Sequence, residues 1–140
     1  MAKARFHVQQ FVVCRRAEVH RAAPNNPYTL RDVAYVFEVP ADTEFPAVEP
    51  ELWAFVRFVN GRGRRGFGIE VVWLDGPGGE QVTGFYMLAP VVFGVAPVVL
   101  ERAWKLNNVR FEGSGRYEFR LRAGAGRLFA RDFIEVRRGL

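Results

Sequence analysis

The stretch RYEFRLR, residues 116–122, decides the fold class of this 140-residue chain. Its two aromatic residues and its leucine alternate with charged residues, and this period of two is typical of a strand with one buried face. A glycine-rich turn follows at residues 123–127, and a second strand pattern covers residues 128–137. The two segments therefore predict an antiparallel hairpin near the end of the sequence.

Patterns with a period of two also cover much of the sequence before this hairpin. Residues 52–59 and 67–74 predict two strands, the first of which is apolar on almost both sides. Between residues 100 and 111 the apolar positions change parity at Asn107 and Asn108, which predicts a β-bulge.

The first third of the sequence predicts two more strands and a loop. Residues 6–19 and 29–39 have strand patterns and flank a turn at residues 22–27, whereas residues 41–50 contain two prolines and predict a loop with a short turn of helix.

Turn signals recur about every 8 to 14 residues, which predicts an all-β fold: a single antiparallel β-sandwich of about seven to nine strands, immunoglobulin-like or C2-like. No repeat or linker divides the sequence, so residues 1–140 are expected to form one domain.

Residues 81–100 form a run without a charged residue, and its 20 residues would be long enough to span a membrane. Pro90, Pro97 and two glycines interrupt the run, and each proline would cost a helix about 3 kcal/mol or more. The run therefore predicts separate buried strands and no membrane span. Its residues 91–100 are a candidate edge for self-association.

Hydrophobic residues make up 49% and aromatic residues 14% of the sequence, which excludes a disordered chain. The single cysteine excludes a disulfide scaffold.

Basic residues outnumber acidic ones by 20 to 15, and all but two of the basic residues are arginines. Residues 1–31 carry six basic and one acidic residue, whereas residues 32–56 carry six acidic and no basic residues. These blocks favour a polarised protein-binding surface over a basic groove for nucleic acid.

Residues 61–66 read GRGRRG and match the glycine spacing of dinucleotide-binding loops. No helix pattern follows, and the Lys-Ser/Thr pair of a P-loop is absent, so the segment predicts an arginine-rich hairpin tip. Exposed arginines suit contacts with acidic groups, because the guanidinium donates two parallel hydrogen bonds. The candidate partner-binding residues are Arg62, Arg64 and Arg65, together with Arg120 and Arg122 on the polar face of the terminal hairpin.

Few residues in the sequence are suited to metal binding or catalysis. His7, His20 and Cys14 lack the spacing of metal ligands. Four acidic residues within 42–51 offer a calcium site as an alternative, without the dense Asp and Asn pattern of calcium loops. The only serine, Ser114, lies in a predicted turn and lacks the strand-to-helix elbow of hydrolases. We therefore expect no enzyme, no metal and no cofactor; catalysis would need Ser114 or Cys14 beside a histidine.

Three segments together resemble a bacterial family of small β-sandwich proteins that has no known activity. They are residues 45–63, residues 67–72 and the GRYEFRL stretch at 115–121, which a closing strand follows. The shared features are an N/D-G-x-G turn and a terminal G-x-Y-x-F-x-L hairpin; in immunoglobulin-like domains the tyrosine of such a hairpin packs a corner. The resemblance covers about residues 14–137, implies the same fold and brings no catalytic residues.

The sequence thus predicts a non-enzymatic interaction or accessory domain that binds a protein partner or self-associates. Nucleic-acid binding through the arginines at residues 61–66 is the alternative, and it predicts an affinity that falls steeply with salt. The N-terminal residues contain no apolar run of signal-peptide length, so a cytoplasmic location is expected.

Overall fold

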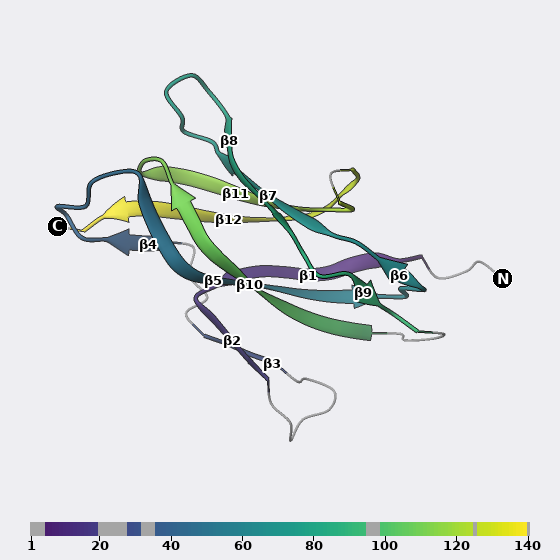
Figure 1. The fold of residues 1–140 in the computed structure, drawn as a ribbon. Coiled ribbons are helices and arrows are strands. Elements are labelled where there is room, and N and C mark those ends of the chain that lie inside the picture. Colours follow the sequence, from purple (N-terminus) through teal and green to yellow (C-terminus); the bar gives the residue numbers. More distant parts are fainter. Residues whose placement is uncertain (1–4, 20–27, 32–35, 95–98, 125, 140) are drawn as a thin grey trace.

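The computed structural model describes residues 5–19, 28–31, 36–94, 99–124 and 126–139. These residues form twelve strands and no helix, so the all-β class predicted from the sequence is confirmed. The strands belong to four sheets, two larger and two small (Figure 1). The finer prediction of one sandwich with seven to nine strands is not confirmed by this arrangement.

The two larger sheets contain three and five strands. The three-stranded sheet is antiparallel and has the order β1 (His7–Cys14), β5 (Ala47–Val59), β10 (Val99–Phe111). The five-stranded sheet has the order β4 (Val36–Val39), β12 (Leu128–Arg138), β11 (Gly115–Arg122), β7 (Gly68–Trp73), β8 (Gln81–Met87). Its pairs are antiparallel except that of β4 with β12, which is parallel.

The two small sheets have two strands each: β2 (Arg16–Val19) with β3 (Tyr28–Arg31), and β6 (Arg64–Arg65) with β9 (Val91–Val92). The strand expected at residues 6–19 is therefore divided, because β1 pairs with β5 whereas β2 pairs with β3. The strand expected at residues 29–39 is divided between β3 and β4. The turn expected at residues 22–27 lies outside the described residues.

Side chains from both larger sheets form one hydrophobic core. Leu52 and Val56 of β5 belong to the same cluster as Ile69 of β7 and as Phe119 and Leu121 of β11, and all five are 0% exposed. Full burial of such a side chain stabilises the folded state by about 1.5–3 kcal/mol. The shared core therefore holds the two sheets against each other.

The terminal hairpin predicted from the sequence is confirmed, since β11 and β12 pair antiparallel along their length. Tyr117 on β11 is fully buried, and its hydroxyl donates a 2.6 Å hydrogen bond to the carbonyl oxygen of Gly113. The same hydroxyl accepts a 3.1 Å hydrogen bond from the Gly113 N–H. These bonds fix the turn before β11 to the core, as a corner tyrosine does in immunoglobulin-like domains.

The long strand β10 changes the parity of its buried residues without a β-bulge. Leu106 and Val109 are both buried, yet the pairing of β10 with β5 keeps one register from end to end. Asn108 has a φ of 55°, a left-handed conformation that asparagine adopts more readily than most residues. This one residue turns the strand, so no extra residue is needed, and the bulge predicted at Asn107 and Asn108 is wrong.

β5 begins at Ala47, earlier than the sequence predicts. The loop expected at residues 41–50 is thus confined to residues 40–46, and none of these is helical. Prolines led to that prediction, because proline removes a ladder hydrogen bond. Pro50 nevertheless lies inside β5, whose pairing with β10 continues on both sides of it.

The uncharged run at residues 81–100 contains β8, β9 and the start of β10, and its residues 95–98 lie outside the described part. The predicted burial holds for Val91, which is 2% exposed, but is wrong for β8, where Val82 and Met87 are 58% and 69% exposed. β8 is an edge strand, so part of its surface lacks a covering neighbour. No helix among the described residues has the length and apolar character to cross a membrane.

Candidate functional site: the basic end

The strands of the two larger sheets run side by side, so their connections gather at two ends of the molecule (Figure 1). One end holds residues 5–6 before β1, residues 60–67 between β5 and β7, residues 88–94 after β8, and the turn at 123–127 between β11 and β12. The described charged residues of these segments are Arg5, Arg62, Arg64, Arg65 and Arg127, and none is acidic. We call this surface the basic end.

Backbone hydrogen bonds join the segments of the basic end to one another. The Phe93 N–H donates to the Gly63 carbonyl over 2.8 Å, and the Gly124 N–H donates to the Gly66 carbonyl over 3.2 Å. The side-chain amide of Asn60 donates to the backbone carbonyl of residue 5 over 3.3 Å. Segments far apart in the sequence therefore present their arginines on one connected surface.

Residues 61–66 cross from one larger sheet to the other, so the predicted hairpin tip is wrong. β5 pairs with β1 and β10, whereas β7 pairs with β11 and β8. Within this crossing, Gly63 has a φ of 67°, a conformation that favours glycine. Gly61 packs so closely on the ring of Phe93 that an added Cβ would lie 2.2 Å from it. The ring thus supports the segment that carries Arg62, Arg64 and Arg65.

A cluster of phenylalanines lies beneath the basic end. The ring centroid of Phe6 is 5.6 Å from that of Phe93 and 5.4 Å from that of Phe129, both in edge-on contact. The rings of Phe58 and Phe67 stand 4.8 Å apart in the same cluster. Pairs of this kind contribute about 0.5–1.5 kcal/mol beyond the burial of their area.

Two of the arginines lie over rings of this cluster. The guanidinium carbon of Arg65 is 4.2 Å from the centroid of Phe6, and that of Arg127 is 5.3 Å from the centroid of Phe129. Ring contacts orient a guanidinium and leave its N–H groups available to an anion. All five arginines of the basic end are exposed, and no acidic side chain among the described residues forms an ion pair with any of them.

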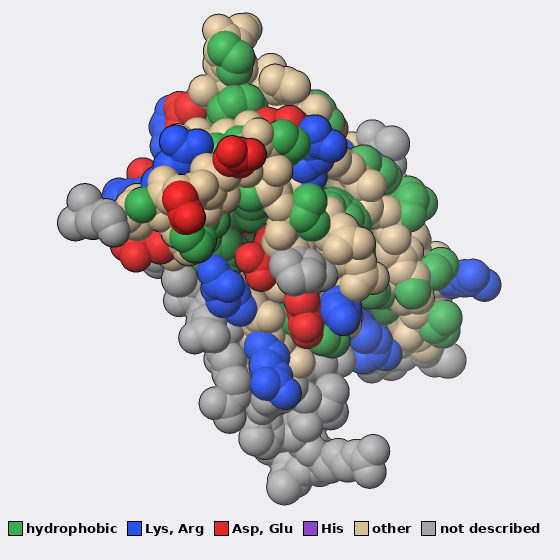
Figure 2. All heavy atoms as spheres, turned by 60° about the vertical axis from the view of Figure 1, so that its left-hand side comes forward, with side chains coloured by type: hydrophobic (Ala, Val, Ile, Leu, Met, Phe, Trp, Pro, Cys, Tyr) green, Lys and Arg blue, Asp and Glu red, His purple; other side chains and the backbone are tan. Residues whose placement is uncertain are grey.

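The loops at the opposite end carry the opposite charge. Residues 40–46, 74–80 and 112–114 contain five acidic residues and no basic one. Arginines on the adjoining strands pair with several of these acids, and Figure 2 shows basic and acidic side chains interspersed on this side. Hydrogen bonds from the Arg116 side chain and backbone lower the pKa of Asp75 from 3.8 to about 2. Local pairing thus offsets charge at this end, in contrast to the basic end.

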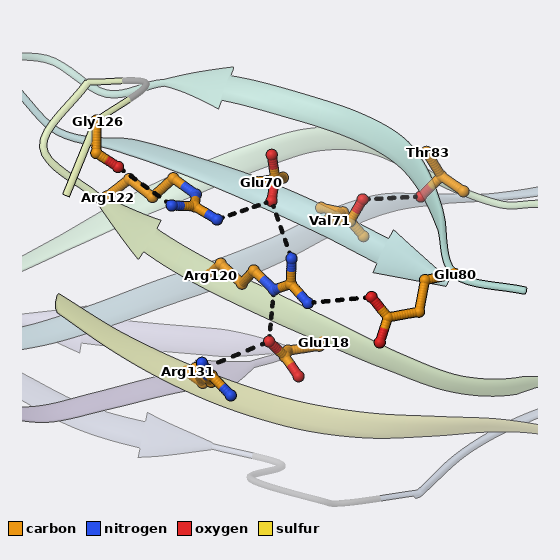
Figure 3. A network of polar contacts seen from close by, with 9 residues as sticks. All are labelled: Glu70, Val71, Glu80, Thr83, Glu118, Arg120, Arg122, Gly126 and Arg131. Atoms are coloured by element: carbon orange, nitrogen blue, oxygen red, sulfur yellow. Dashed lines mark hydrogen bonds and ion pairs between the residues drawn. The ribbon is translucent and has the colours of Figure 1, made fainter. Parts of the chain in front are cut away.

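Arg120 and Arg122 lie on the outer face of the five-stranded sheet in a network of ion pairs (Figure 3). Arg120 contacts Glu70, Glu80 and Glu118, and the hydrogen bond with Glu118 is the main cause of its raised pKa. The second arginine contacts Glu70 over 3.4 Å and donates to the backbone carbonyl of residue 126. Both therefore lie on the polar face as predicted, but their side chains are only 19% and 23% exposed because of these contacts.

The structure therefore brings together three of the five predicted partner-binding residues, Arg62, Arg64 and Arg65, and places the other two in the network on the sheet face. Arg5 and Arg127 were not predicted, and both belong to the basic end. Each is a single arginine in a short segment far from residue 62 in the sequence. No local motif connects them, and only the pairing of β1 with β5 and of β11 with β7 places them there.

The described candidates for catalysis lie on different elements or at different ends of one strand. Ser114 is exposed in the turn before β11, and its backbone carbonyl accepts a hydrogen bond from the Trp73 indole. Cys14 is fully buried at the opposite end of β1 from His7, while His20 lies outside the described residues. Among the described residues, no group of three or more His, Cys, Asp or Glu side chains is arranged to hold a metal ion.

No protein-family model and no curated protein matches the chain. The resemblance to a bacterial family of small β-sandwich proteins is therefore not confirmed by these comparisons.

One solved structure with little sequence identity shares the fold. A part of the alkylpurine DNA glycosylase AlkC of Pseudomonas fluorescens, solved bound to DNA containing an abasic site analog, matches 94% of this chain with 9% identity and a TM-score of 0.53. The chain spans 30% of the length of that protein.

Two further structures match with lower scores. A β-D-glucoside glucohydrolase of Trichoderma reesei has 11% identity and a TM-score of 0.47 over 94% of this chain and 19% of its own. An immunoglobulin-like protein of Pseudomonas aeruginosa has 14% identity and a TM-score of 0.38 over 98% of this chain and 100% of its own. At 9% identity the match to AlkC speaks to the fold and leaves the function open, and the two matches with a TM-score under 0.5 carry no argument.

Proposed function

We propose that this chain is a non-enzymatic, immunoglobulin-like binding domain whose basic end docks an acidic segment of a protein partner. The observation that carries the proposal is the set of five exposed arginines, none of which is paired with an acidic side chain among the described residues. Arginine is weakly hydrated and donates paired hydrogen bonds to a carboxylate, so such a surface favours acidic ligands.

The immunoglobulin-like assignment is supported by the corner at Tyr117. Tyr117 bonds both backbone groups of Gly113 at the corner before β11. In this proposal the eight strands of the two larger sheets form the sandwich, and the small sheets lie at its periphery.

A protein partner is favoured because apolar side chains adjoin the arginines. Val92 on β9, within the basic end, is 64% exposed, and Val99 at the start of β10, which pairs with Val59 next to that end, is 50% exposed. Exposed ion pairs contribute about 0.2–1 kcal/mol each, so five of them fall short of the roughly 8 kcal/mol of a micromolar complex. Contact of the partner with these valines supplies the additional stabilisation, and such a mixed surface is typical of protein interfaces.

Nucleic-acid binding is the second candidate, and the arginines that lack acidic neighbours also favour it. A duplex that contacted all five would lose affinity with salt with a logarithmic slope of about −4.5. The two candidates are therefore separable by their probes and by salt.

The test compares two double variants that remove the same charge. Arg62→Ala with Arg64→Ala removes two arginines from the basic end, whereas Arg110→Ala with Arg137→Ala removes two that are 54% and 56% exposed elsewhere. The probes are a fluorescent polyglutamate peptide with an apolar residue at each end and a fluorescent DNA duplex, followed by anisotropy.

We expect the peptide to bind, the first variant to weaken binding about tenfold, and the second to change it by less than about threefold. Because Arg62 and Arg64 are exposed, the free energy of unfolding should change by less than about 0.5 kcal/mol. Equal loss in both variants, or binding of neither probe, would refute a site at the basic end. Binding of the duplex alone would favour the second candidate.

A further inference from the structure

β8 has a free edge. It is the last strand of the five-stranded sheet and, among the described residues, it pairs only with β7. An unpaired edge exposes alternate backbone N–H and C=O groups, which are a template for pairing with another strand. Figure 1 shows the loop between β7 and β8 projecting away from the body of the protein, so the beginning of this edge is accessible.

Charged or bonded side chains on other edges of the larger sheets discourage such pairing, whereas β8 has a single register shift, at Thr83, and no charge. β10 contains Glu101, Arg102 and Lys105, and charged residues on an edge oppose the approach of a second strand. The backbone N–H of Val13 on β1 donates to the carboxylate of Asp132 over 2.7 Å, so a side chain of β12 occupies part of that edge. β8, by contrast, reads QVTGFYM and has no charged residue.

Exposed apolar side chains accompany this free edge. Val82, Phe85 and Met87 are 58%, 41% and 69% exposed. The ring of Phe85 lies across Gly68 of β7, where an added Cβ would lie 2.4 Å from it, so the glycine allows the ring to lie flat on the sheet. A strand added beside β8 would cover part of this apolar surface.

The charges at the two ends of β8 are complementary to each other. Glu80 immediately precedes β8, and its side chain is 64% exposed although it lies 3.6 Å from Arg120. The other end of β8 leads to the basic end, where β9 pairs with the exposed Arg64 and Arg65. When two copies meet with their β8 strands antiparallel, the acidic end of each strand lies beside the basic end of the other.

We infer that two copies of this chain associate through their β8 edges, antiparallel about a two-fold axis, and join two five-stranded sheets into one. The partner is a second copy because the uncharged edge, the exposed apolar residues and the opposite charges at its ends are all self-complementary under this symmetry. The inference shares Arg64 and Arg65 with the basic end but does not depend on which ligand binds there.

A matched pair of variants tests the inference. Val82→Lys places a charge on the free edge, whereas Val48→Lys places the same charge on β5, a central strand, at a valine that is 54% exposed. Sedimentation equilibrium over a wide range of protein concentration gives the dimer dissociation constant. Thermal melting verifies that both variants are folded, which the exposure of both valines favours.

We expect the unmodified chain to dimerise, Val82→Lys to raise the dissociation constant about tenfold or more, and Val48→Lys to leave it within about twofold. Hydrogen exchange should show amides of β8 that become protected as protein concentration rises, and high salt should weaken the dimer. A strict monomer at all concentrations, an equal effect of the two lysines, or protection of another edge instead of β8 would overturn the inference.

Discussion

Removing the hydroxyl of Tyr117 should be among the most costly single-atom changes in this protein. In Tyr117→Phe the ring keeps its contacts, but the carbonyl and the N–H of Gly113 lose the 2.6 Å and 3.1 Å hydrogen bonds made by the hydroxyl. Both groups are buried, and a buried polar group without a partner costs about 1–3 kcal/mol. We therefore expect a loss of about 3 kcal/mol, which corresponds to roughly 12 °C in Tm for a chain of this size.

Urea unfolding followed by tryptophan fluorescence measures this loss, and Tyr86→Phe provides the matched control. The Tyr86 hydroxyl donates a longer, exposed hydrogen bond of 3.3 Å to the carbonyl of Asn108, which water can replace. The control should lose about 0.5 kcal/mol. If Tyr117→Phe cost no more than the control, the corner would not fix the turn before β11.

Two further predictions concern the opposite end and the crossing segment. The pKa of Asp75 is lowered from 3.8 to about 2, so its pairing with Arg116 stabilises the fold above pH 3.8 and is lost as the pH falls toward 2. Asp75→Asn should therefore flatten the fall of Tm between pH 3.8 and pH 2. An unchanged profile of Tm against pH would exclude this role. Gly61→Ala should lower the free energy of unfolding in urea by about 1–3 kcal/mol, because the new Cβ would lie 2.2 Å from the Phe93 ring. Gly78→Ala, where a Cβ has open space, should lower it much less. Equal losses in the two variants would show that the ring moves freely.

The terminal hairpin could be predicted from sequence because each of its features is local. Alternation in residues 116–122 marks the buried face, and the adjacent glycines mark the turn. The parity change in β10 was also visible, but the sequence could not distinguish an inserted residue from the left-handed backbone of Asn108. Both produce the same pattern of apolar residues along a single strand.

Long-range pairing explains what the sequence could not show. Residues 61–66 have the composition of a hairpin turn, yet the strands on either side pair in different sheets. The side chain of Arg120 points away from the core, as the alternation predicts. It nevertheless forms ion pairs with Glu70 on the neighbouring strand β7 and with Glu118 on its own strand. The basic end itself depends on segments that meet only after the sheets have formed.

The most direct test of the basic end as a binding surface is a titration of the ¹⁵N-labelled protein with the acidic peptide, followed by the shifts of backbone amide signals. We expect the largest shifts at residues 61–66, at Val92 and at Arg127, with little change in the loops at residues 40–46 and 74–80. Shifts concentrated in those two loops, or no shift at residues 61–66 at saturating peptide, would contradict binding at the basic end.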